Sequence, residues 1–522
     1  MKAVVNFPKA GKMVQVETGT KVIEAIRRCG LSLETPCNCA SLCGKCKVKA
    51  FGKLSPISKE EAAFINEENV RLACIAEVQG DADIEFFESV KTLKTINRGF
   101  SIKAEANSEI RNKYKERERV CGVAFDIGTT GLSAYLLDLR SGEVLNTASA
   151  LNPQTEYGGD VISRITFCME NEDGAHILTS SIRKKLNDII GQLLAGTISR
   201  EDIYVITVAA NTTMLHLLAE ENPESIAKAP YKAVFLDKQE YLGKDLGLEI
   251  NENGMVILLP SASAYVGADI ISGIVATDFI NKKNNSIFID IGTNGEIVAN
   301  CNGVLAAAST AAGPALEGMN ISCGSRAING AIDKFHIDEE YNITYSTIGG
   351  EKAKGICGSG LIDVAAALVS SGIVEKSGRF NPKIHEKLKE RLVNKKFYIT
   401  EEIYVSQKDI RQIQLAKGAI SSGIIMLLKE LDIKIEEIDE VVIAGAFGYH
   451  VEAESIKTIG LIPKGFNGEV FFVGNSSVEG AALAAISDNV LNKMIEIKEK
   501  LKMVELSKKA DFQDFFVREL NF

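Results

Sequence analysis

Four cysteines near the start of the chain are spaced as ligands of an iron–sulfur cluster. Cys37, Cys43 and Cys46 have five and two residues between them, and 27 residues separate Cys46 from Cys74. Three thiolates on one loop with a distant fourth are typical of a [2Fe-2S] centre. Zinc is the alternative, but a zinc site usually has two Cys-x-x-Cys pairs, and only Cys43 and Cys46 form one. The spacing predicts a [2Fe-2S] cluster, with Cys39 as a surplus thiol that could exchange with Cys37.

Two copies of an Asp-Ile-Gly-Thr turn follow, each at the end of an apolar run. The turns span 125–131 and 289–295, and their aspartates are 164 positions apart. Threonine hydroxyls and backbone N–H groups of such a turn can contact phosphate oxygens, and the aspartate can hold Mg²⁺ through its waters. No Gly-x-x-x-x-Gly-Lys-Ser/Thr sequence occurs, which argues against a P-loop. The residues assigned to phosphate or Mg²⁺ are Asp126, Gly128, Thr129, Thr130, Asp290, Gly292, Thr293 and Asn294.

The elements that must position the cysteines form a small α+β unit over 1–95. The pattern predicts a hairpin around 8–11, a helix ending at Gly30 and a helix opened by a Ser58/Glu61 capping box. Strands are expected at 2–7, 12–17, 45–51, 71–78 and 81–87. Residues 96–118 are charged on all faces and are predicted to be a linker or an exposed helix.

The elements that must position the two turns alternate strands and helices from Cys121 onward. A unit of three consecutive strands surrounds each turn, which indicates an internal duplication of a mixed-sheet domain. The strands of these units are expected at 121–127, 132–139, 143–150, 286–291, 295–300 and 303–309. Two subdomains are predicted at 119–260 and 261–490, followed by a C-terminal extension at 491–522.

Composition excludes several classes of function. The net charge of -10 and pI near 5.4 argue against non-specific nucleic-acid binding, which needs a basic surface. No run of 18 apolar residues occurs, so no membrane span is expected. The N-terminal residues alternate like a strand and lack the apolar segment of a signal peptide, so we expect a cytoplasmic protein. Its eleven cysteines are then not a disulfide framework.

Several longer stretches carry a resemblance to known proteins. The two turns and the strand end "IAGAFG" resemble the phosphate 1, phosphate 2 and adenosine motifs of the acetate and sugar kinase/Hsp70/actin superfamily. The chain is similar to the reductive activators of corrinoid proteins over roughly residues 1–490, with Cys39 standing where that family leads one to expect glycine. The stretches that carry this similarity are "CGKCKVKAFGKLSPIS", "NPQTEYGGDVISRI", "NTTMLHLL", "SASAYVGADI", "AAGPALEGM", "GICGSGLIDV" and "DIRQIQLAKGAI".

The resemblance implies both a fold and an activity. The fold would be an N-terminal β-grasp ferredoxin-like domain followed by a duplicated ribonuclease H-like ATPase of the actin/Hsp70 type, hence α+β and α/β. The activity would be ATP-dependent reduction of the inactive Co(II) form of a corrinoid protein to Co(I), by one electron from the [2Fe-2S] cluster. Its partners would be a corrinoid protein of a methyltransferase or one-carbon system and a low-potential electron donor, with homodimer formation left open.

The resemblance also implies roles for further residues. Asp269 would position the attacking water, and Glu317 would contact the ribose. Gly313 is carried over as a nucleotide-binding residue. The adenosine side would be lined by Gly445, Ala446 and Phe447.

Three other functions stay open on the sequence. The first is an activator of radical dehydratases, although that class shares one cluster across a dimer and has few cysteines per chain. The second is a non-redox actin-like or chaperone-like ATPase with a vestigial cluster domain. The third is a small-molecule kinase, for which the ferredoxin-like domain would have no purpose.

Overall fold

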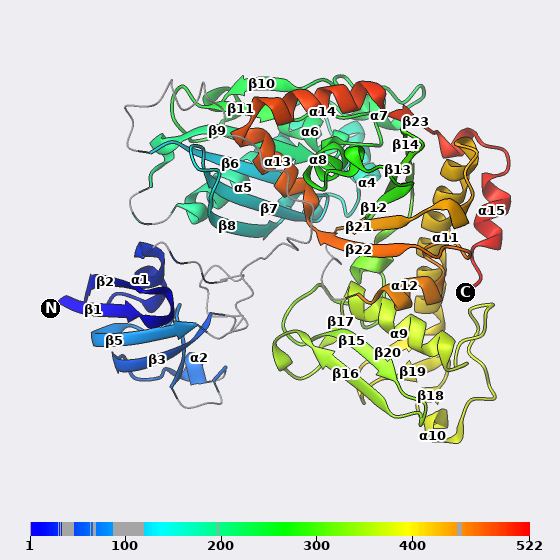
Figure 1. Ribbon diagram of the computed structural model, residues 1–522, viewed down its shortest axis with the longest axis horizontal. Coiled ribbons are helices and arrows are strands. Elements are labelled where there is room, and N and C mark those ends of the chain that lie inside the picture. Colours follow the sequence, from blue (N-terminus) through cyan, green and yellow to red (C-terminus); the bar gives the residue numbers. More distant parts are fainter. Residues whose placement is uncertain are drawn as a thin grey trace.

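The computed structural model forms an N-terminal unit and a larger body built on two six-stranded sheets (Figure 1). The structure describes residues 2–29, 31, 33, 46–62, 64–65, 69–86, 119–194, 196, 198–445 and 451–522. The predicted linker at 96–118 therefore lies outside the described residues. None of the described helices is long and apolar enough to cross a membrane.

The N-terminal unit is a five-stranded mixed sheet in the order β2-β1-β5-β3-β4. The predicted hairpin is confirmed: β1 and β2 pair antiparallel across a short 3-10 helix, and Gly11 takes the left-handed conformation that ends it. Helix α1 packs near β2, and the apolar side chains between them form one core. The elements are β1 (Lys2–Phe7), β2 (Lys12–Glu17), α1 (Val22–Arg28), β3 (Lys47–Leu54), α2 (Lys59–Ala62), β4 (Val70–Leu72) and β5 (Val78–Phe86).

The segment 71–78 is not the single strand that its sequence predicts. Strand β4 ends at Leu72, and the chain turns through residues 73–75 before β5 begins. The cause is the buried carboxylate of Glu61, which accepts hydrogen bonds from Arg71 Nε (2.9 Å), Arg71 Nη2 (2.9 Å) and Leu72 N (2.8 Å). The Glu61 carboxylate therefore stabilises this turn. Of the expected capping box, the hydrogen bond from Glu61 N to Ser58 Oγ is present at 3.2 Å, but the Glu61 side chain is used at the turn.

A Glu61→Gln variant should lower the free energy of unfolding of the N-terminal unit by about 3 kcal/mol or more, because it leaves a buried guanidinium without its anion. The side chains of Glu61 and Arg71 are 0% and 9% exposed. Urea unfolding of the full chain, monitored through the loss of iron–sulfur absorbance, measures this change in free energy. The double variant Glu61→Leu/Arg71→Met removes both charges and should be more stable than Glu61→Gln; equal stability of Glu61→Gln and the parent chain would contradict the prediction.

The first large sheet has the order β10-β11-β9-β6-β7-β8. The predicted three-strand unit is confirmed, because β6 pairs antiparallel with β7, and β7 with β8. Strand β9 then joins β6 in parallel. The strands are β6 (Cys121–Ile127), β7 (Gly131–Asp138), β8 (Val144–Leu151), β9 (Ile203–Ala210), β10 (Gln239–Leu242) and β11 (Met255–Leu258).

The second large sheet repeats this arrangement in the order β22-β21-β12-β13-β14-β23. Strands β12, β13 and β14 form the second antiparallel unit, and β21 joins β12 in parallel. In both units the turn aspartate is the last residue but one of the first strand. The strands are β12 (Ser286–Ile291), β13 (Gly295–Cys301), β14 (Val304–Thr310), β21 (Glu440–Ala444), β22 (Glu469–Gly474) and β23 (Lys502–Met503).

Helices cover both sheets, and one of them connects the two. Helix α13 follows β22 of the second sheet but packs against β6, β9 and α8, so it brings the C-terminal part of the chain onto the first sheet (Figure 1). Helix α14 also packs against α8, whereas the long α11 packs against β13, β14 and α15. The helices named from here on are α4 (Val161–Glu170), α5 (Gly174–Leu193), α6 (Thr212–Ala219), α8 (Ala268–Ala276), α11 (Gln407–Glu430), α13 (Ser476–Ile486), α14 (Asp488–Lys500) and α15 (Phe512–Arg518).

The remaining elements are shorter or lie beside the second sheet. Two three-stranded sheets have the orders β16-β15-β17 and β18-β19-β20. Their strands are β15 (Ala331–Ile337), β16 (Ile343–Thr347), β17 (Gly355–Ile356), β18 (Leu392–Val393), β19 (Lys396–Tyr398) and β20 (Tyr404–Ser406). The other helices are α7 (Glu224–Ala227), α9 (Gly358–Ser370), α10 (Glu386–Lys389) and α12 (Ala453–Ile459).

Candidate nucleotide and cluster sites

The aspartate of the first turn is held by residues that the sequence did not point to. Asp126 accepts hydrogen bonds from Asn475 Nδ2 at 2.7 Å and from Ser477 Oγ at 2.9 Å. Asn475 caps α13, and its side chain accepts the N–H of Val478. The fold of α13 onto the first sheet thus brings the sequence "GNSS" to Asp126. No local signal could have found this contact, because it joins residues 349 positions apart.

The aspartate of the second turn lies against the predicted adenosine motif. Asp290 on β12 is paired in register with Ala444 on β21. The next residue, Gly445, has φ of +107°, and a Cβ there would lie 2.7 Å from Ile291 O and 3.0 Å from Asp290 Oδ1. Only glycine lets the backbone come so close. The other two predicted adenosine residues, Ala446 and Phe447, lie outside the described residues.

A Gly445→Ala variant should weaken MgATP binding by about tenfold or more, because the new methyl group must displace Asp290 or the end of β12. The matched control is Gly303→Ala in the β13–β14 turn, where φ is +79° but a Cβ would have no atom within 4 Å. Titration with a fluorescent ATP analogue measures both variants. Equal losses in the two would mean that backbone strain, rather than proximity to Asp290, matters.

Asp269 joins the two turn aspartates in one partly buried acidic group. It lies in the first turn of α8, and its Oδ1 accepts the N–H of Ile270 at 2.9 Å. Burial, and then the charges of Asp290 and Asp126, raise the pKa of Asp269 to about 8. Burial, then Asp126 and Glu317, raise the pKa of Asp290 to about 7. Carboxylates that repel one another in a partly buried place are suited to a divalent cation.

Sequence reasoning missed a further carboxylate of this group, Glu296. It is paired with Asp290 across β12 and β13, so both side chains lie on the same face of the sheet. Burial, and then the charges of Asp269 and Asp290, raise its pKa well above the ordinary value. The corresponding partner of Asp126 in the first unit is Ser133. Comparing the two repeats at this position would have revealed the extra acid.

The second turn is closed by contacts with the segment after β14. Gly292 N donates to Asn294 O at 2.9 Å, and Gly313 N donates to Thr293 O at 2.8 Å. Thr293 Oγ1 donates to Glu317 Oε2 at 3.0 Å. The structure therefore brings Gly313 and Glu317 to the turn, as the predicted site requires.

The first turn is built differently from the second. Asn211 Nδ2 donates to Thr129 Oγ1 at 3.1 Å, which ties the turn to the start of α6. A Cβ on Gly128 would lie 2.8 Å from Gly131 O, so this turn needs glycine. Among the described residues, the buried Thr130 hydroxyl has no hydrogen-bond partner. An unsatisfied hydroxyl in the first turn, together with a partly buried acidic group, fits a nucleotide with its metal ion.

Two of the four predicted cluster ligands lie in the described residues and are brought together. Ala73 N donates to Cys46 O at 2.9 Å, so the start of the strand that follows Cys46 and the turn that carries Cys74 are adjacent. Both cysteines are buried, 1% exposed each, in the core of the N-terminal unit. Cys37, Cys39 and Cys43 lie outside the described residues. Thiols from two adjacent segments fit the predicted cluster but are only half of its ligand set.

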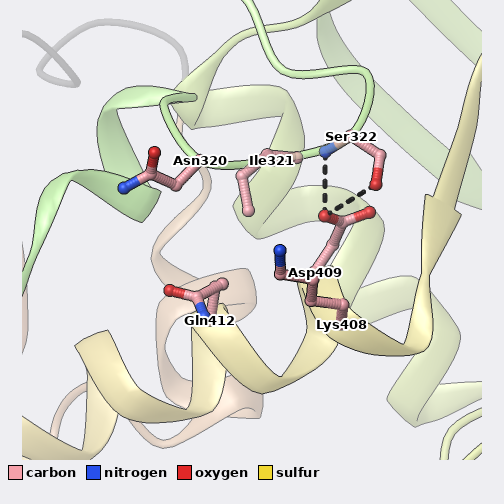
Figure 2. Close-up of a pocket in the computed structure, with 6 residues that line it drawn as sticks. All are labelled: Asn320, Ile321, Ser322, Lys408, Asp409 and Gln412. Atoms are coloured by element: carbon pink, nitrogen blue, oxygen red, sulfur yellow. Dashed lines mark hydrogen bonds between the residues drawn. The ribbon is translucent and has the colours of Figure 1, made fainter.

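A pocket of about 450 Å³ lies apart from these residues, at the start of α11 (Figure 2). Ser322 N and Ser322 Oγ both donate to Asp409 Oδ1, at 2.8 and 3.1 Å. Asp409 also completes the capping box of α11 with Ser406. None of the predicted site residues lines this pocket, so its contacts explain how "DIRQIQLAKGAI" begins its helix rather than how a nucleotide binds.

Two family models match the larger body of the chain. Residues 121–282 match the family described as the RACo middle region, and residues 284–522 match the C-terminal domain of RACo, the ASKHA domain. A corrinoid activation enzyme, RamQ of Eubacterium limosum, is 37% identical over 426 residues, which are 78% of this chain and 70% of that protein. A Co(II) methylated amine-specific corrinoid protein reductase of Methanosarcina barkeri is 27% identical over 441 residues, 77% of each chain.

A solved structure extends the similarity to the whole chain. A reductive activator for a corrinoid, iron-sulfur protein superposes with a TM-score of 0.72 at 29% identity, covering 100% of this chain and 98% of that one. The predicted fold class and the resemblance to corrinoid activators are therefore confirmed. The chain belongs to the family of reductive activators of corrinoid proteins.

Proposed function

We propose that this chain returns the inactive Co(II) form of a corrinoid protein to Co(I), using ATP and one electron delivered through a [2Fe-2S] cluster. The observation that carries the proposal is the combination, in one chain, of adjacent buried cysteines at 46 and 74 with a partly buried acidic group that includes the aspartates of both duplicated turns. Relatives whose names state corrinoid activation or reduction support it.

The residues of the proposed site have distinct tasks. Asp126 and Asp290 would hold Mg²⁺ through its waters, and Asp269 would position the water that attacks ATP. When bound, the cluster supplies one-electron chemistry and Mg²⁺ neutralises phosphate charge. Nucleotide contacts are assigned to Gly128, Thr129, Thr130, Gly292, Thr293, Asn294, Gly313, Glu317, Gly445, Ala446 and Phe447. The cluster ligands would be Cys37, Cys43, Cys46 and Cys74.

The need for ATP follows from redox energetics. A [2Fe-2S] centre of the plant ferredoxin type lies near roughly -400 mV. Each ~59 mV by which a one-electron transfer is uphill costs about a factor of ten in the equilibrium. ATP can offset this only if its bound states differ in their affinity for the corrinoid protein or its cobalt states. We therefore propose that the ATPase part docks on the corrinoid protein and alters the ligation of its cobalt.

Two partners follow from this chemistry. The client would be a corrinoid protein of a methyltransferase or one-carbon system, and the electron would come from a low-potential donor. We further propose a cytoplasmic location, in keeping with thiol-ligated iron.

The test is an anaerobic mixture of the reconstituted full chain, a Co(II) corrinoid protein and a low-potential reductant. Methylated amine-specific corrinoid protein and corrinoid, iron-sulfur protein are supplied in turn as clients. We expect the absorption of Co(I) to appear with MgATP and to stay absent without it. If ATP is hydrolysed but Co(I) forms with neither client, the corrinoid assignment is overturned. The client would then be a radical dehydratase or a protein that is not reduced.

A further inference from the structure

A buried arginine lies directly behind the first turn. Arg164 on α4 is 0% exposed, and its Nη2 donates to Thr129 O. Its Nε donates to Gly158 O at 3.0 Å, and its Nη1 lies 3.1 Å from both Gln154 Oε1 and Met214 Sδ. Within the described part of the chain, all of these acceptors are neutral, and the charge that acts on Arg164 in its favour is that of Asp160, the N-cap of α4. Burial lowers the pKa of Arg164 only to about 10, so the guanidinium keeps its charge at neutral pH.

Residues of the segment 152–164 donate hydrogen bonds to the three carbonyl groups of residues 128–130 in the first turn. Asn152 Nδ2 donates to Gly128 O at 2.9 Å, and Asn152 N donates to Thr130 O at 2.9 Å. Arg164 Nη2 donates to the carbonyl oxygen between them, Thr129 O. In a trans peptide the N–H points opposite to the C=O. The N–H of Thr130 therefore points away from Arg164, and the cation polarises the Thr129–Thr130 peptide toward a stronger N–H donor.

The second turn differs from the first at the equivalent carbonyl group. Its threonine, Thr293, contacts the carboxylate of Glu317, and among the described residues no buried cation donates to the carbonyl of that threonine, which instead accepts from Gly313 N. A buried positive charge whose hydrogen-bond acceptors are all neutral is costly, so it is expected where it serves an anion. The duplicated turns are thus electrically different.

We propose that Arg164 is a positioning residue that makes the first turn the anion-binding side of the nucleotide site. It would act through the Thr129–Thr130 peptide rather than by touching the nucleotide. Gln154 would hold it in place, since Gln154 Nε2 donates to Leu178 O at 3.1 Å and so turns Oε1 toward the guanidinium. The inference explains why "NPQTEYGGDVISRI" and the methionine of "NTTMLHLL" occur together, and it rests on the proposed use of ATP.

The experiment compares the affinities of the full chain for MgATP and for adenosine, by calorimetric or fluorescence titration. Arg164→Met should weaken MgATP binding by about 10-fold to 100-fold, the effect of losing a charge-assisted hydrogen bond. Adenosine binding should change less than about twofold. Arg164→Lys should fall between, because it keeps the charge but not the planar fork.

The matched control is Arg183→Met on α5. Arg183 also donates to a backbone carbonyl, Leu218 O, at 3.0 Å, but this partner and its other one, Glu220, lie at the end of α6 and not on the first turn. The Arg183→Met variant should leave the ratio of the affinities for MgATP and adenosine unchanged. If Arg164→Met does not fold, Gln154→Glu keeps an acceptor beside Arg164 while neutralising its charge, and it should lower the preference for MgATP over adenosine.

Two outcomes overturn the inference: equal losses for MgATP and adenosine, or an unchanged preference in both Arg164→Met and Gln154→Glu. Failure of the proposed function looks different. A parent chain that binds MgATP but gives no Co(I) loses its client assignment while the role of Arg164 stands.

Discussion

An Asp290→Asn variant should hydrolyse ATP at least about 100-fold more slowly than the parent chain. The substitution keeps the shape of the side chain but removes one negative charge from the partly buried group that would hold Mg²⁺. A loss of about 100-fold corresponds to roughly 2.7 kcal/mol of transition-state stabilisation, in the range expected for one well-placed electrostatic contact. Steady-state phosphate release at saturating MgATP measures the rate.

The control for this variant is Asp278→Asn. Asp278 follows α8, has φ of +50°, a conformation that asparagine also tolerates, and lies outside the acidic group. It should hydrolyse ATP within about twofold of the parent chain. A normal rate in Asp290→Asn would show that the second turn does not carry the metal.

The carboxyl groups of Asp290 and Asp269 should make the stability of the folded chain depend on pH. The pKa values of Asp290 and Asp269 are raised to about 7 and about 8 in the folded chain, whereas an unfolded aspartate titrates near roughly 4. The folded state therefore binds more protons between these values, and its stability falls as pH rises from about 4 through about 8. Without Mg²⁺, urea midpoints at pH 6 and 8.5 should show this fall, and Asp290→Asn should reduce it. Mg²⁺ needs the ionised forms, so its affinity should rise over the same window.

The second large effect is expected from Cys46→Ala and Cys74→Ala. Each variant should lose the visible absorption of the cluster and lower ATP-dependent Co(I) formation at least about 100-fold, because an alanine offers no ligand to iron. ATP hydrolysis should persist, since the two cysteines belong to the core of the N-terminal unit and the acidic group belongs to the larger body. Absorption after anaerobic reconstitution and the Co(I) assay measure the two properties.

Cys168→Ala provides the control for general thiol loss. Cys168 is 7% exposed in the core of the first large sheet, and burial raises its pKa to about 11. Its removal should leave the cluster and Co(I) formation intact. A full cluster in Cys74→Ala would show that Cys39 or another thiol replaces it.

Local patterns were sufficient for much of the fold. Apolar alternation predicted the hairpin at 2–17 and both three-strand units, because strand periodicity and glycine-bounded turns depend on neighbours in the chain. The same kind of reasoning failed at 71–78. There the strand ends at Leu72, where the backbone N–H donates to the carboxylate of Glu61, a residue of α2.

The sequence by itself determined the two Asp-Ile-Gly-Thr turns, their duplication and the spacing of the N-terminal cysteines, since each is a pattern within a short stretch. Only the tertiary structure decided which side chains support them. Asn475 reaches Asp126 because α13 returns to the first sheet, and Arg164 reaches Thr129 because α4 lies behind the turn. Contacts of this kind depend on how elements pack, and packing brings together residues whose separation along the chain carries no periodic signal.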